Sequence, residues 1–429
     1  MTGAGSDAQA GSHTQGGSDT QGGSDDPGGS PGAAIDALAA RLRPHYGRFL
    51  ARPDVLLTGH SHQAWPDVSR DAQLEAWDDA ARLADHKWDR IFGEIIPGLQ
   101  RAIARRLGCD RPGALAFAPN THELVYRLLS CFPRDARVVT TDHEFHSMRR
   151  QLLRLEEDGQ PIVRVPVGPD ASAGLGDFVA RFVDTLAAVR PAVAMLSHVF
   201  FTTGAIVREL PALLAAAERL DVTVLVDTYH GFNAIPIDTS RWPGTRWFLV
   251  GGGYKYAASG EGVCWMLTPP DTRALRPRHT GWFASFGSLA RPEAHVDYGD
   301  GAERFWGATF DPTALYRGLR VLEWMDAVGL DVPTLRAQST RQTAHLLDGY
   351  HARGLAARGL GVASPRAAGD RAAFVSFTHP DAPGLARALA ARGVHTDARL
   401  QYLRLGPAPY TTTADLEAGL DALAQVLAG

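Results

Sequence analysis

The chain has 429 residues, 45% of them apolar and 21% charged, and its formal net charge is -4. This composition is typical of a globular protein with ample core, and the slightly acidic balance excludes a basic surface for nucleic acid or an acidic membrane. Three scattered cysteines and the lack of an apolar run of about 18 residues argue against a disulfide framework, a zinc site and a membrane span, so we expect a cytoplasmic protein without a metal.

The first part of the chain is low in apolar residues. Residues 1–32 are rich in Gly, Ser, Asp and Gln and predict a disordered tail, because they can bury little apolar surface. Residues 33–55 predict an N-terminal helical segment of a small domain, with an amphipathic helix from Ile35 to Leu50. Residues 71–107 predict longer helices that are broken near Pro97.

Beyond residue 114, short β-rich runs alternate with helical patterns. This alternation predicts an α/β fold, with a mostly parallel mixed sheet in a large domain over residues 56–315. In such sheets ligands bind beyond the carboxyl ends of the strands. The expected strands are 114–117, 137–141, 162–167, 192–197, 223–226, 247–250 and 262–267, and the expected helices are 122–131, 148–157, 176–189 and 209–220.

The last part of the chain predicts a smaller α+β domain, over residues 316–429. A helical stretch over 313–347 leads out of the large domain. The expected strands are 372–377 and 402–405, and the expected helices are 383–392 and 413–427.

Two residues in this pattern indicate the chemistry. Among 43 Lys and Arg residues only Lys87 and Lys255 are lysines. Arginine stays protonated, whereas a lysine with a lowered pKa can form an imine with an aldehyde. Lys255 follows an apolar run and three glycines, and Asp227 ends the preceding strand. Either residue alone would be an ordinary strand end or loop cap. Together they predict a pyridoxal 5'-phosphate (PLP) site, in which a carboxylate keeps the pyridine nitrogen protonated.

Several motifs then resemble one enzyme family. Asp227-Thr-Tyr-His230 and Tyr254-Lys-Tyr256 match an Asp-x-x-His and Tyr-Lys-Tyr pair, and residues 197–204 match a His-Val-x-x-x-Thr-Gly loop. Gly281-Trp-Phe283 and residues 403–410 match two further segments. The chain, from about Leu56 onward, resembles the class V aminotransferase group of fold-type-I PLP enzymes, and within that group the kynureninases.

The resemblance implies roles around the cofactor. Lys255 would form the imine with the cofactor and move the proton at the substrate α-carbon, with Asp227 at the ring nitrogen. Tyr254 would donate to the phosphate and completes the expected catalytic set. Three groups of residues would hold the remaining parts of the cofactor: Asn120 and Thr121 at the phosphate, Phe145 stacked on the ring, and His230 near the ring oxygen side.

The resemblance also implies a partner and a substrate side. Trp282 and Thr309 would reach the phosphate from a second subunit, so we expect a homodimer with shared active sites. Arg404 would bind the carboxylate of a small amino-acid substrate, and Ser61 and His86 would line the substrate side. The chain has Gly59-His-Ser-His62 where the family has Gly-Asn-Ser-Leu.

A second difference lies at Ser285, which replaces a histidine that many kynureninases carry. Both differences lie on the substrate side, so the substrate is less closely implied than the cofactor. The expected activity is hydrolysis of the β,γ C–C bond of L-kynurenine or a related γ-keto amino acid. A C–S β-lyase, a class V aminotransferase and a non-catalytic binding module remain alternatives. A persulfide-forming desulfurase is disfavoured because no cysteine follows Cys264.

Overall fold

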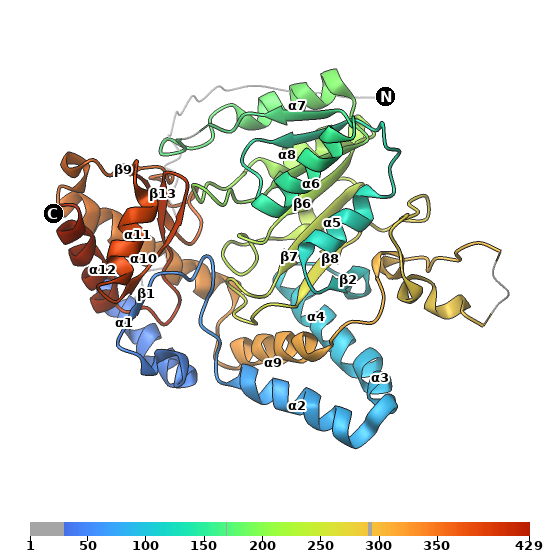
Figure 1. Ribbon diagram of the computed structural model, residues 1–429, viewed down its shortest axis with the longest axis horizontal. Coiled ribbons are helices and arrows are strands. Elements are labelled where there is room, and N and C mark those ends of the chain that lie inside the picture. The colour runs from blue at the N-terminus through green and yellow to red at the C-terminus, as the bar shows by residue number, and fades with distance from the viewer. Residues whose placement is uncertain (1–29, 169, 291–293) are drawn as a thin grey trace, which may run out of the picture.

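A computed structural model describes residues 30–168, 170–290 and 294–429. Its largest feature is a seven-stranded sheet in the order β2, β8, β7, β6, β5, β3 and β4 (Figure 1). Within this sheet β8 is antiparallel to both of its neighbours, and the other pairs are parallel. The predicted α/β class with a mostly parallel mixed sheet is confirmed. The strands are β2 (Leu115–Ala118), β3 (Val138–Thr141), β4 (Ile162–Val165), β5 (Val193–Ser197), β6 (Thr223–Asp227), β7 (Trp247–Gly252) and β8 (Cys264–Leu267).

Helices connect these strands and cover the sheet. α5 packs on β2, β7 and β8, α7 packs on β3 and β4, and α8 packs on β6. Strands β2, β3, β5 and β7 are buried along their whole length, as expected for a sheet that is covered on both faces. The predicted helices are confirmed, and each of their ends lies within two residues of the predicted end. They are α5 (Thr121–Leu129), α6 (His146–Glu157), α7 (Phe178–Val189) and α8 (Leu210–Arg219).

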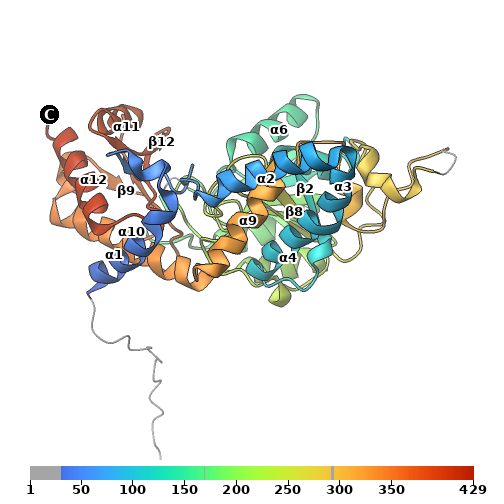
Figure 2. The same ribbon diagram turned by 90° about the horizontal axis from the view of Figure 1, so that it is seen from below.

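A layer of helices comes mostly from residues before β2. The helical stretch predicted over residues 71–107 is interrupted, but not near Pro97 as predicted. The chain turns sharply at Ala84, which has a positive φ of 49°. Pro97 instead lies in the first turn of a helix, where the missing N–H does no harm, and a π-helical turn at Ile91–Ile95 leads into it. The helices of this layer are α2 (Val68–Leu83), α3 (Lys87–Arg90), α4 (Ile96–Arg106) and α9 (Thr313–Ala327), and Figure 2 shows α9 between α2 and α4.

The C-terminal part has its own sheet and its own hydrophobic core. Strands β12 (Asp397–Arg399), β13 (Tyr402–Leu405), β10 (Val375–Thr378) and β9 (Gly361–Val362) form an antiparallel sheet in that order. β1 (Val55–Leu56) pairs in parallel with β11 (Val394–His395). The helices around them are α1 (Pro31–Leu42), α10 (Val332–Ala352), α11 (Ala382–Ala390) and α12 (Thr413–Val426). No helix in the described ranges is both long and apolar enough to cross a membrane.

The packing refines the expected domain limits. Most of the predicted tail lies outside the described residues, but α1 begins at Pro31 and therefore includes the last two tail positions. α9 packs against α2 and α4, whereas α10 packs against α1 and α12. Gly329, with a φ of 71°, lies in the turn between α9 and α10. We therefore propose that the boundary between the two domains lies at residues 328–331, after the expected residue 316.

Candidate active site

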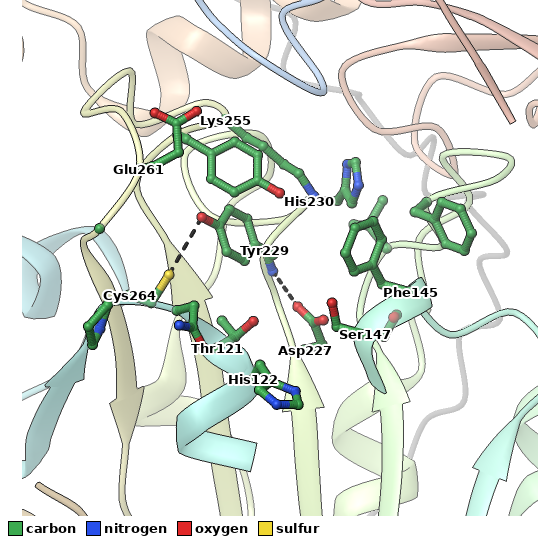
Figure 3. Close-up of a pocket in the computed structure, with 17 residues that line it drawn as sticks. Thr121, His122, Phe145, Ser147, Asp227, Tyr229, His230, Lys255, Glu261 and Cys264 are labelled. Carbon is green, nitrogen blue, oxygen red and sulfur yellow. Dashed lines mark hydrogen bonds between the residues drawn. The ribbon is translucent and has the colours of Figure 1, made fainter. Parts of the chain in front are cut away.

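A cavity of about 190 Å³ lies where the parallel strands end (Figure 3). Residues that follow β2, β3, β5, β6 and β7 line it, together with residues at the start of β8. This is the edge of the sheet where an α/β protein binds its ligands. Seven of the predicted cofactor residues line this cavity: Asn120, Thr121, Phe145, Asp227, His230, Tyr254 and Lys255.

Lys255 is buried among aromatic rings, with 4% of its surface exposed. Its Nζ lies 4.6 Å from the ring centroid of Tyr229, 5.3 Å from that of Phe145 and 5.6 Å from that of Tyr254. Burial lowers the pKa of the Lys255 amine to about 7, although the charge of Asp227 acts in the opposite direction. A large share of this amine is therefore neutral near pH 7, the form in which it can react with an aldehyde.

The glycines before Lys255 have a packing reason. A Cβ on Gly252 would lie within about 2.4 Å of the ring atoms of Tyr229, and a Cβ on Gly251 would overlap Trp265. A side chain at either position would therefore displace a ring. The glycine run lets Tyr229 lie directly over the end of β7, beside the amine of Lys255. Its function here is close approach, since neither glycine has a positive φ.

Asp227 ends β6 and reaches the cavity. Its Oδ1 accepts the backbone N–H of Tyr229 at 2.8 Å, which fixes the orientation of the carboxyl group. Burial raises the pKa of Asp227, while that N–H and the charge of Lys255 lower it. The neighbouring His230 is buried, and burial together with Lys255 holds its pKa well below the ordinary value. The Nδ1 atom of His230 has no hydrogen-bond partner among the described residues.

The other end of the cavity is formed by the N-terminus of α5. Oδ1 of Asn120 accepts the N–H of Glu123 at 2.9 Å and caps the helix, and Thr121 is its first residue. A helix N-terminus of this kind attracts a phosphate. The residues that line the cavity in the described part of the chain include no arginine. A phosphate dianion would therefore be only partly balanced by groups of one chain.

These observations fit PLP in this cavity. Lys255 supplies an amine for the aldehyde, Asp227 a carboxylate for the ring nitrogen, Phe145 an aromatic face and α5 a phosphate end. Each group comes from a different strand end, and all of them converge on one cavity. No group of three metal-ligating side chains occurs in the described ranges.

Trp282 and Thr309 lie together, but outside this cavity. Nε1 of Trp282 donates to Oγ1 of Thr309 at 3.2 Å, and 44% of the Trp282 surface is exposed. Thr309 lines a second cavity of about 540 Å³, which also contains Arg127 and Arg278. Neither residue therefore lines the cavity around Lys255 in its own chain.

The three expected substrate residues are not among the residues that line the cavity. Arg404 is buried and already engaged, because it donates to Asp397 Oδ2 at 2.6 Å and to the carbonyl oxygen of Phe201 at 2.7 Å. Its two Nη atoms are thus bonded to its own chain, behind the cavity wall that Phe201 forms.

Neither Ser61 nor His86 lines the cavity of its own chain. The hydroxyl of Ser61 donates to the carbonyl of Thr58 at 3.1 Å. The side chain of His86 is 86% exposed in the bend after α2, within 3.4 Å of Asp89. Both positions reflect the sharp turns of the backbone on either side of α2, which the sequence pattern did not locate.

The structure adds residues that the sequence analysis did not identify. Tyr229, Ser197, Phe201, Glu261 and Cys264 also line the cavity. Tyr229 lies inside the Asp-x-x-His motif. Its position close to the strand-end carboxylate of Asp227 is the sequence signal that could have identified it. Burial raises the pKa of Cys264 to about 12, so its thiol is protonated and unreactive.

Sequence comparisons identify related proteins. A family model described as the kynureninase C-terminal domain matches residues 335–423. A kynureninase of Pseudomonas fluorescens is 28% identical over 323 residues, which are 68% of this chain and 75% of the relative. A kynureninase of Burkholderia mallei is 28% identical over 343 residues, which are 76% of this chain and 79% of the relative.

Solved structures have the same fold. A C-DES mutant with glycine covalently linked to its PLP cofactor matches with a TM-score of 0.76 and 18% identity, covering 89% of this chain and 98% of that one. A cysteine desulfurase from Thermococcus onnurineus matches with a TM-score of 0.71 and 15% identity, covering 88% and 95%. Matches at this identity carry over the fold alone. The cavity and these likenesses together indicate a PLP-dependent enzyme that has the fold of these structures and whose sequence is similar to kynureninases.

Proposed function

We propose that the chain is a kynureninase-type hydrolase that cleaves the β,γ C–C bond of L-kynurenine or a related γ-keto amino acid. The observation that carries the proposal is the buried amine of Lys255, with a pKa near 7, beside the carboxyl group of Asp227. The relatives that carry the name kynureninase direct the choice of substrate. Water adds to the γ-carbonyl carbon, the Cβ–Cγ bond breaks, and Cβ takes up a proton. The products are alanine and an anthranilate-like acid.

The residues of the cavity would have different roles in the reaction. Bound PLP supplies the electron sink that acidifies the substrate α-carbon. Lys255 would take and return the proton at that carbon, since a pKa of about 7 leaves a large share of its amine neutral near pH 7. The carboxylate of Asp227 would hold a proton on the ring nitrogen, and the Tyr229 N–H keeps that carboxylate oriented. The face of Phe145 would limit tilting of the ring.

Arg404 would be the substrate-carboxylate residue once its contact with Asp397 opens. A substrate carboxylate can replace Asp397 as the acceptor of an Arg404 N–H at little cost in hydrogen bonds, because one charged acceptor replaces another. We therefore infer that substrate binding moves Asp397 and β12 away from Arg404. Ser61 and His86 would act on the substrate only after such a movement or from a second subunit.

The assembly and location belong to the same proposal. The exposed pair Trp282 and Thr309 would reach the phosphate of a second copy, which gives a homodimer with shared sites. The cytoplasm is the proposed location, since Cys109, Cys131 and Cys264 are all unpaired. A persulfide-forming desulfurase is disfavoured, because the thiol of Cys264 is protonated and no cysteine follows it.

The test is incubation of the PLP-loaded protein with L-kynurenine and with 3-hydroxykynurenine. Formation of alanine with the corresponding anthranilate would support the proposal. Pyruvate from a cysteine conjugate, without kynurenine cleavage, would replace it by a C–S β-lyase. Amino-group transfer that requires a keto acid would replace it by an aminotransferase.

A further inference from the structure

A buried carboxyl group beneath the cavity has no part in the chemistry described so far. Glu144 lies in the loop between β3 and α6, and only 2% of its surface is exposed. It accepts three hydrogen bonds: from the Thr141 hydroxyl at 2.6 Å, from the Ser197 N–H at 3.1 Å and from the Ser197 hydroxyl at 2.7 Å. Burying a carboxyl group costs free energy, so a loop that only connects a strand to a helix would not require a buried glutamate.

The partners of Glu144 belong to the two walls of the cavity. Ser197 ends β5, lines the cavity and pairs in register with Asp227 on β6. Phe145 follows Glu144 in the chain and lines the cavity on another side. The hydrogen bonds of Glu144 therefore connect the loop that carries Phe145 to the end of β5, where Ser197 lies beside Asp227.

The hydrogen bonds of Glu144 depend on whether its carboxyl group is protonated. Burial raises the pKa of Glu144 to about 7, the hydrogen bonds from Thr141 and Ser197 lower it, and the charge of Asp227 raises it. Asp227 is the charged group that acts on Glu144 from the neighbouring strand. The two carboxyl groups therefore influence each other, and a change at one is transmitted to the other.

We propose that Glu144 is a positioning residue for the cofactor: through Ser197 and Phe145 it fixes the space between the carboxylate of Asp227 and the aromatic face. Glu144 touches neither cofactor nor substrate, since it does not line the cavity. The inference rests on the proposed placement of the PLP ring between Asp227 and Phe145. It does not depend on which substrate is cleaved.

The experiment uses the PLP-loaded protein with Glu144→Gln and Ser197→Ala, and with Glu156→Gln as the matched control. Glu156 is an exposed glutamate on α6 that pairs with Arg164, so the control makes the same chemical change outside the network. The visible absorption and circular dichroism bands of bound PLP are recorded from pH 6 to 9. PLP retention is measured by equilibrium dialysis, and the thermal unfolding of the apoprotein reports any purely structural effect.

We expect both network variants to change the visible circular dichroism and to weaken PLP retention about tenfold, as expected for a lost hydrogen bond to a carboxylate. The pH at which the visible bands of bound PLP are half converted should fall by about half a unit in Glu144→Gln. Removal of a negative charge disfavours the protonated form of nearby groups. The kcat should fall with little change in KM. Bands, titration and retention equal to those of Glu156→Gln would overturn the inference.

A third variant protects the test against a folding failure, because Ser197 itself lines the cavity. If Glu144→Gln does not fold, Thr141→Val decides, since Thr141 does not line the cavity and its replacement removes one hydrogen bond to Glu144 and leaves the two from Ser197. A fall in apoprotein stability with unchanged bands of bound PLP would also overturn the inference. Failure of the wild type to cleave kynurenine would contradict the proposed function alone, because the spectroscopic readouts need no substrate.

Discussion

The two ends of the cofactor site differ in how much of the site one chain supplies. At the ring end, Lys255, Asp227 and Phe145 meet around a single cavity, and only 4% of the surface of Lys255 is exposed. At the outer end, Trp282 is 44% exposed and donates its Nε1–H to the hydroxyl of Thr309. One chain thus brings together the residues expected around the ring, together with Asn120 and Thr121, whereas Trp282 and Thr309, which are expected at the phosphate of a second subunit, lie outside the cavity.

The outer surface has the character of an interface. Phe286, next to Trp282, is 52% exposed, and the two rings lie 5.2 Å apart. Clustered exposed aromatic side chains of this kind mark a contact site. The phosphate end of the cavity has a helix N-terminus, and no arginine is among the described residues that line the cavity. The difference suggests that chemistry and cofactor retention can be separated by mutation.

Replacing Lys255 should have the largest effect. Lys255→Ala and Lys255→Arg should each lower kcat/KM at least about a thousandfold, because neither side chain supplies a neutral amine. Borohydride should attach PLP covalently to the wild type but to neither variant, as measured by mass spectrometry of the peptide. Lys87→Arg is the matched control, since it changes the other lysine of the chain. Full activity in Lys255→Arg would contradict the assignment.

Asp227→Asn should come next. Loss of the carboxylate at the ring nitrogen weakens the electron sink, and we expect kcat to fall about a hundredfold or more with the fold retained. Steady-state kinetics with far-ultraviolet circular dichroism measure both. A change of less than about threefold would mean that Asp227 does not face the ring nitrogen.

The outer end should give a smaller effect of a different kind. Trp282→Ala combined with Thr309→Ala should weaken PLP binding about tenfold, through loss of two phosphate contacts. Trp77→Ala is the control, since Trp77 is also exposed, at 68%, on α2. Mixing this double variant with an equal amount of Lys255→Ala chains should return wild-type PLP affinity to about a quarter of the sites, because half of the dimers are mixed and each mixed dimer has one intact site. No recovery after subunit exchange would contradict a shared site.

The sequence could locate the ring end because its signals are local. Asp227 and Lys255 both follow continuous apolar runs, and the parallel order of such strands brings their carboxyl ends to one edge. In the seven-stranded sheet, the strand limits were predicted to within two residues for the same reason, whereas the strand predicted at 372–377 begins three residues later, at Val375. The scarcity of lysine then separated Lys255 from the many arginines.

The substrate side could not be located in this way, because its contacts join distant segments. The partner of Arg404 is Asp397, which lies opposite it on β12. β12 has three residues, too few to show a β period. The break at Ala84 depends on a single positive φ, which no composition signal marks. The function of Tyr229 depends on the space left by Gly252, and such packing appears only in three dimensions.

The smallest predicted effect concerns the pH dependence of PLP uptake by the apoprotein. With a pKa near 7, about half of the Lys255 amine is neutral at pH 7, so the rate of uptake should rise only about twofold between pH 7 and pH 9. An ordinary lysine, with a pKa near 10.4, would gain roughly a hundredfold over the same interval. The rise comes from loss of the amine proton, so the sign is an increase with pH that levels off above about pH 8. Stopped-flow absorbance of the visible band measures it, and a steep rise that continues to pH 9 would show that the ring end leaves the amine solvated.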